Sequence, residues 1–267
     1  MASAEIGASA LLDKATLKDR FKVMVHPTCG EAIVVRNIDF SKSLGDLDAA
    51  RIAEKNAVRF ATKEQRSLES SRARTRGKVR RWCVHNQASR KATLTFRDDD
   101  LPDDIDEMWQ RVKFFRRRLD RAGIPQPLLV PEAGSKTGRL HLHGAMRTYV
   151  KQSDLADLWG HGFVSLDRRQ AGGDSGDREI MRRQASYLAG YVSKIGKGSA
   201  FDLVGKGRRR YSIPTKSSPP PPERLSGDSL YELIVEAQRL CGHDLEQRWS
   251  SDALEAWEGP PTAVLMG

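Results

Sequence analysis

The chain has 267 residues, enough for one well-buried core with segments left over, and its formal net charge of +10 suits a polyanionic partner. It holds no apolar run long enough to cross a membrane and no signal-peptide core at its N-terminus, so we expect a cytoplasmic protein. Its cysteines, Cys29, Cys83 and Cys241, are odd in number and far apart, which argues against a disulfide framework.

The first 85 residues predict an extension that leads into a basic helical segment. Two short apolar runs, 21–25 and 32–35, carry no recognisable chemistry. Residues 46–85 read as helical and become increasingly basic towards their end.

A strand and an amphipathic helix are expected next. Residues 91–96 are rich in β-forming side chains. Apolar residues then recur at intervals of three and four from Ile105 to Ala122, which predicts a helix that Gly123 and Pro125 end.

The next segment carries the first candidate site. His141 and His143 alternate with leucines on a predicted strand, so both imidazoles project from one face, roughly 7 Å apart. Glu132 ends the preceding apolar run, and the glycines between predict a hairpin that returns Glu132 to the histidines. These three residues predict a metal site. The same combination of two histidines and one carboxylate also occurs in zinc hydrolases and non-haem iron oxygenases.

The second candidate site lies on a helix expected over 177–195. A helix over 153–159, a strand over 163–166 and a glycine-rich loop precede it. Tyr187, Tyr191 and Lys194 share one face of this helix. The alternative is that the tyrosines pack in the core and keep their hydroxyls in water.

These elements follow the order β-α-β-β-α-β-α. That order predicts an α+β fold, an antiparallel sheet with packed helices on the ferredoxin-like, split βαβ plan. We expect four regions: an N-terminal extension over 1–85, the site-bearing domain over 86–200, a basic and proline-rich linker over 201–222, and a small helical appendage over 223–267.

Three motifs in this order resemble those of the HUH endonucleases, specifically the rolling-circle replication initiators of single-stranded DNA phages and plasmids. The strand motif is Lys91–Phe96, the histidine motif is His141–His143, and Tyr187–Lys194 is similar to the two-tyrosine motif. The segment 158–164 is also similar to a stretch found in such initiators. Gly190 departs from the family, because phage replication proteins have a lysine before the second tyrosine.

The resemblance implies single-stranded DNA nicking with Mg²⁺ or Mn²⁺ on Glu132, His141 and His143. Tyr191 or Tyr187 would form a 5′-phosphotyrosine, leaving a 3′-OH that primes synthesis, with Lys194 close to the phosphate. The implied partners are single-stranded or hairpin origin DNA and a host helicase and polymerase, in a bacterial cytoplasm. The sequence contains no GxxxxGK[ST] loop, so we do not predict a helicase in the chain itself.

Basic residues cluster in three stretches that we expect to contact DNA. Some of the aromatic residues in or near them could stack on unpaired bases: Trp82, Phe96, Trp109, Trp159 and Tyr211, of which Trp109 is expected in the core. The stretch 111–121 is one of the three basic stretches. The proposed DNA-binding residues of the other two are Arg74, Arg76, Lys78, Arg80, Arg81, Lys206, Arg208, Arg209 and Arg210. A solvated charged face is the alternative for each stretch.

Rival functions remain at this point. A metal oxygenase or hydrolase would use the triad but not the tyrosine helix. A non-enzymatic nucleic-acid-binding regulator would explain the charge alone, and a mobilisation relaxase or transposase of the same superfamily would share the chemistry. A small zinc site formed by His26, Cys29, Cys83 and His85 is a further alternative.

Overall fold

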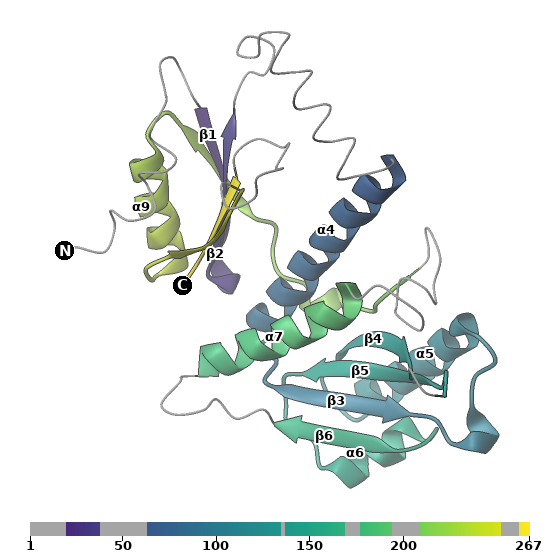
Figure 1. Cartoon of the computed structure of the whole chain (residues 1–267). Coiled ribbons are helices and arrows are strands. Elements are labelled where there is room, and N and C mark those ends of the chain that lie inside the picture. Colours follow the sequence, from purple (N-terminus) through teal and green to yellow (C-terminus); the bar gives the residue numbers. More distant parts are fainter. Residues whose placement is uncertain (1–19, 38–62, 135–136, 169–176, 194–208, 252–261) are drawn as a thin grey trace. The chain divides into compact units, whose positions relative to one another are not determined.

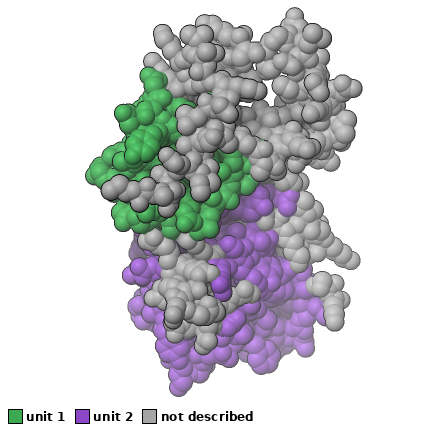
Figure 2. Space-filling model, turned by 60° about the vertical axis from the view of Figure 1, so that its left-hand side comes forward, with its two compact units in different colours: residues 1–67, 220–267 green, residues 68–219 purple. Residues whose placement is uncertain are grey.

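A computed structural model describes residues 20–37, 63–134, 137–168, 177–193, 209–251 and 262–267. The chain divides into two compact units, 68–219 and the combination of 1–67 with 220–267 (Figure 2). Among the described residues, no helix is long and apolar enough to cross a membrane.

The larger unit is built on a four-stranded antiparallel sheet in the order β4-β5-β3-β6 (Figure 1). Its elements, in chain order, are α4 (Lys63–His85), β3 (Arg90–Thr95), α5 (Ile105–Arg121), β4 (Leu128–Ala133), β5 (Leu140–Met146), α6 (Gln152–Trp159), β6 (Val164–Arg168) and α7 (Asp177–Ser193). From β3 to α7 the order is the one that the sequence predicted. The α+β class, with helices packed on an antiparallel sheet, is therefore confirmed.

One face of this sheet is covered by α5 and α6. Asp104 caps α5 by accepting a hydrogen bond from the Glu107 amide at 2.8 Å, and the apolar stripe of that helix is buried. Phe96 and Trp159 lie in the same core and are almost wholly inaccessible. Trp82, in the core beneath α4, is equally buried, so the expectation that these three side chains stack on unpaired bases is wrong.

The opposite face packs against α4 and α7 (Figure 1). Leu128, Val130 and Ala145 of the sheet lie in one core with Val79 of α4 and Leu188 of α7. Because side chains alternate along a strand, the polar residues of β3, β4 and β5 that share this face also point towards α7. This alternation creates the candidate site.

The outer edge of β4 is occupied by the chain that follows Arg210. Leu129 and Ser212 exchange backbone hydrogen bonds of 3.0 and 2.8 Å. Pro131, two residues further along, has no amide hydrogen to donate. An edge strand such as β4 tolerates this, and the missing donor ends the pairing there. Part of the expected linker is thus packed against the larger unit, while residues 201–208 lie outside the described residues.

The smaller unit is a five-stranded antiparallel sheet in the order β7-β1-β2-β9-β8, with one helix packed on it. Its elements are β1 (Arg20–His26), β2 (Glu31–Asn37), β7 (Glu223–Gly227), α9 (Leu230–Cys241), β8 (Glu246–Ser250) and β9 (Thr262–Met266). The expected extension and helical appendage therefore contribute to one sheet, in which β1 pairs with β7 and β2 with β9. The apolar runs of the first region form β1 and β2, two of its three inner strands.

Candidate active site

Glu132, His141 and His143 converge at one end of the β4–β5 hairpin. Glu132 is the cross-strand partner of His141, and both imidazoles project from the α7 side of β5. His143 Nε2 lies 2.9 Å from Glu132 Oε2. His141 Nε2 lies 3.3 Å from the same oxygen and 3.2 Å from His143 Nε2. The hairpin thus brings together the three residues that the sequence singled out.

These distances fit one metal ion. Two ligand atoms at about 2.1 Å from an ion are about 3.0 Å apart at a right angle and about 3.4 Å apart at a tetrahedral angle. His141 Nδ1 lies 3.2 Å from the carbonyl oxygen of Arg139, which only accepts, so Nδ1 carries the proton and Nε2 presents its lone pair. The three ligand atoms are therefore close enough to hold one cation between them.

Burial keeps this site in a state suited to metal binding. Only 8% of the His143 side chain and 11% of the Glu132 side chain are exposed. Burial lowers the pKa of His143 to about 4, against the opposing effect of its hydrogen bond to Glu132. The imidazole is therefore neutral at pH 7 and available as a ligand.

The two tyrosines of α7 lie against this triad. Their hydroxyls are 2.7 Å apart. The ring of Tyr191 is centred 4.0 Å from the ring of His143, and that of Tyr187 is 6.2 Å from it. Both rings are partly buried at the margin of the apolar stripe, with Ala185 and Leu188 buried beneath them.

Lys91 is a site residue that sequence reasoning missed. Its ammonium donates a hydrogen bond of 3.1 Å to the Tyr187 hydroxyl and lies 4.6 Å from the centre of that ring. Gly190 offers no cation beside the tyrosines, but β3 supplies one to Tyr187. The sequence signal was only that Lys91 opens the strand motif. That it shares a face with Thr93, the partner of His143, follows from the pairing of β3 with β5. Lys194, the expected cation, lies outside the described residues.

An exposed aromatic residue lies at the triad end of the sheet. Phe163 is 79% exposed, and its carbonyl accepts a hydrogen bond from the amide of Thr95, the partner of His141. With Arg97 and Arg139 it lines a cavity of about 410 Å³. Gly162 permits this placement, because a Cβ there would lie 2.4 Å from the Thr95 carbonyl oxygen.

The basic residues of α4 surround its buried stripe. Arg74, Arg76 and Lys78, here called the α4 basic patch, are exposed, while Arg80 and Arg81 are half-buried.

The third basic stretch is described only in part. Arg209 is exposed and Arg210 half-buried, and Lys206 and Arg208 lie outside the described residues.

The alternative zinc site finds no support in the described part of the chain. There, Glu132, His141 and His143 are the one group of three or more potential ligands that lies close enough to hold an ion. Cys83 is buried in the core beneath α4, and burial raises the pKa of its thiol.

The larger unit is thus an α+β domain in which a candidate metal triad faces two tyrosine side chains. Residues 89–196 match the family model of the replication-associated protein ORF2. No curated protein and no solved structure was found to match the chain. The matched segment holds the triad, Lys91 and both tyrosines, and the likeness supports a role in the initiation of DNA replication.

Proposed function

We propose that the chain is a rolling-circle replication initiator of the two-tyrosine HUH type, which nicks and rejoins single-stranded DNA. The observation that carries this proposal is a contact between two elements that lie far apart in the sequence. The tyrosine pair of α7 lies directly on the triad of the β4–β5 hairpin, with Tyr191 over His143.

Glu132, His141 and His143 would hold a divalent ion, Mn²⁺ or Mg²⁺. Bound there, the ion would polarise the scissile phosphate and stabilise the charge that develops on it. The carboxylate supplies the oxygen ligand that both ions prefer, and the fixed imidazole of His141 presents its nitrogen without a change of tautomer.

Tyr191 is proposed as the first nucleophile, because its ring lies closer to the metal ligand His143 than that of Tyr187 does. Its oxygen forms the new bond to phosphorus while the bond to the 3′ oxygen breaks. The leaving oxygen takes up a proton from water to become the 3′-OH. The tyrosine proton passes to water, directly or through the Tyr187 hydroxyl, which accepts it and gives up its own. Attack of a 3′-OH on the phosphotyrosine reverses the step and rejoins DNA without ATP.

Lys91 would favour negative charge on the tyrosine pair, directly on Tyr187 and through the shared hydrogen bond on Tyr191. Tyr187 would then act in strand transfer or termination, with Lys194 close to the phosphate. An oxygenase or hydrolase of small molecules would have no use for this arrangement, whereas a relaxase or transposase of the same superfamily would use it equally.

The test is formation of a covalent adduct. Overlapping labelled single strands covering both strands of the DNA that encodes the chain and its flanks are incubated with the protein and Mn²⁺, then separated under denaturing conditions. We expect one strand to give an adduct that requires Mn²⁺. His141→Ala with His143→Ala should abolish it while leaving DNA binding largely intact, because the basic residues supply the affinity.

The tyrosine assignment is tested in the same assay. Tyr191→Phe should lose the adduct, Tyr187→Phe should keep it, and the double variant should be inactive. Peptide mapping locates the DNA: attachment to Tyr187 alone would reverse the order of attack. No adduct with any strand, or an adduct on neither tyrosine, would refute the nicking function.

A further inference from the structure

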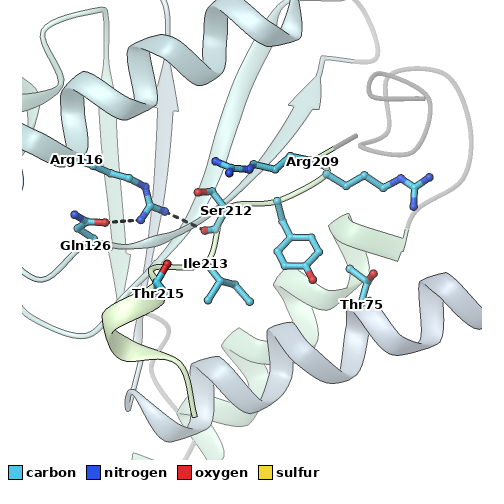
Figure 3. A pocket seen from close by; sticks show the side chains of 9 residues that line it. Thr75, Arg116, Gln126, Arg209, Ser212, Ile213 and Thr215 are labelled. Carbon is cyan, nitrogen blue, oxygen red and sulfur yellow. Dashed lines mark hydrogen bonds between the residues drawn. The ribbon is translucent and has the colours of Figure 1, made fainter. Parts of the chain in front are cut away.

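A polar cavity of about 580 Å³ lies beside the outer edge of β4 (Figure 3). It is lined by Thr75 of α4, Arg116 of α5, Gln126, and the segment that carries Arg209 and Arg210. None of the described residues that line it is acidic. Members of all three predicted basic stretches, or their immediate neighbours, therefore meet at one cavity.

Arg116 is held in place there by neutral acceptors. It donates hydrogen bonds to Gln126 Oε1 at 2.5 Å, to the Pro127 carbonyl at 3.0 Å and to the Ser212 carbonyl at 3.1 Å (Figure 3). Its buried Nε has no hydrogen-bond partner among the described residues. The guanidinium is thus rigidly positioned, and none of the groups that accept its hydrogen bonds is charged.

Gln126 separates Arg116 from the nearest acid on α5. Its amide nitrogen lies 2.8 Å from both carboxylate oxygens of Asp120, while its carbonyl oxygen faces Arg116. Burial, and next the charge of Arg209, lower the pKa of Arg116 to about 10, against the smaller opposing effect of Asp120. Like charges brought together without an acid between them cost stability, and a bound anion would offset this cost.

We propose that this cavity binds a phosphate group of single-stranded DNA, outside the candidate active site. Arg116 provides a fixed positive charge with one Nη1–H beyond the hydrogen bonds given above, and Arg209 provides a second charge, a combination that suits phosphate oxygens. Leu129, whose outer edge pairs with Ser212, precedes Glu132 by three residues, roughly 10 Å along β4. The proposal rests on the proposed function for the identity of the ligand, because it places one strand across both sites.

The decisive variant moves one charge without changing the total. In Asp120→Asn with Gln126→Glu, the side-chain contact is kept with donor and acceptor exchanged, and the net charge stays the same. The new carboxylate faces Arg116 and offsets one of the positive charges at the cavity. Arg209→Gln is a second variant at an exposed position, and Arg121→Gln is the matched control, an exposed arginine on α5 that does not line the cavity.

Binding is measured with the full chain in EDTA, so that nicking does not contribute. The probes are a fluorescent dT 12-mer, followed by anisotropy at several salt concentrations, and 5′-dTMP, followed by calorimetry. We expect the charge exchange to weaken 12-mer binding roughly tenfold or more. Arg209→Gln should reduce the slope of log affinity against log salt by about 0.7 more than Arg121→Gln does.

The outcomes distinguish an isolated phosphate from a backbone diester as the ligand. They also distinguish a failure of the phosphate site from a failure of the nicking function. Weakened binding of both probes means that an isolated phosphate suffices, and weakened binding of the 12-mer alone means that the site needs a backbone diester. Unchanged binding of both probes in the charge exchange and in Arg209→Gln would overturn the site. A chain that never nicks DNA but shows the expected losses keeps the phosphate site and loses only the nicking function.

Discussion

Removal of the Lys91 ammonium should slow adduct formation. Lys91→Met keeps most of the aliphatic stem and removes the charge that donates to Tyr187 over 3.1 Å. A hydrogen bond to a charged group contributes about 1.5–3 kcal/mol, equivalent to roughly 10- to 150-fold in rate. Because Tyr187 stands between Lys91 and Tyr191, we expect the first attack to slow by about tenfold, the lower end of this range. Steps that use Tyr187 should slow by more.

The measurement is the single-turnover rate of adduct formation at saturating DNA, so that binding does not limit it. Arg90→Met is the matched control: it removes one charge from the neighbouring position of β3, where the guanidinium lies over Tyr149 instead. Both variants should lose similar, small amounts of DNA affinity, but only Lys91→Met should lose rate. Equal rates for the two variants would refute the role of Lys91, and Lys91→Arg should recover part of the rate.

Three further predictions concern metal, charge and stacking. Glu132→Gln should weaken Mn²⁺ binding in a titration, whereas Asp167→Asn, an exposed acid of the same sheet, should not; equal titrations would remove Glu132 from the site. Neutralising the α4 basic patch should lower the slope of log affinity against log salt by about 2, and an unchanged slope would make the patch a solvated surface. Phe163→Ala should cost about 1–3 kcal/mol of single-strand affinity in anisotropy titrations, while the exposed Phe114→Ala should not; equal effects would exclude stacking at Phe163.

The triad could be predicted because all of its geometry is local. Strand alternation places His141 and His143 on one face, and a hairpin returns Glu132 to them. The tyrosine pair is equally local, since residues four apart on a helix are neighbours. Lys91 could not be assigned in the same way, because its contact with Tyr187 depends on how β3 pairs in the sheet and on how α7 lies across it.

Long-range pairing explains the other differences. The apolar runs of β1 and β2 were visible, but their partners β7 and β9 lie near the other end of the chain, and one sequence does not show which strands pair. Composition also predicted aromatic stacking from residues that are buried: Trp159 donates its indole N–H to the Thr95 carbonyl within the core. Phe163 is the candidate for base stacking instead because it is exposed, and exposure depends on how the chain packs.

In the proposed activity, exposed residues supply the affinity for DNA, and buried or half-buried residues supply the chemistry. Exposed basic residues on α4 and at Arg209 would bind the DNA backbone wherever it runs, with an energy that salt weakens. The triad and the tyrosines are buried or half-buried, so salt screens their interactions far less. Variants of the basic residues should therefore be rescued by low salt, and variants of the triad should not. A triad variant that low salt restores would indicate that these residues act in binding, and the catalytic role assigned to them would fall with that result.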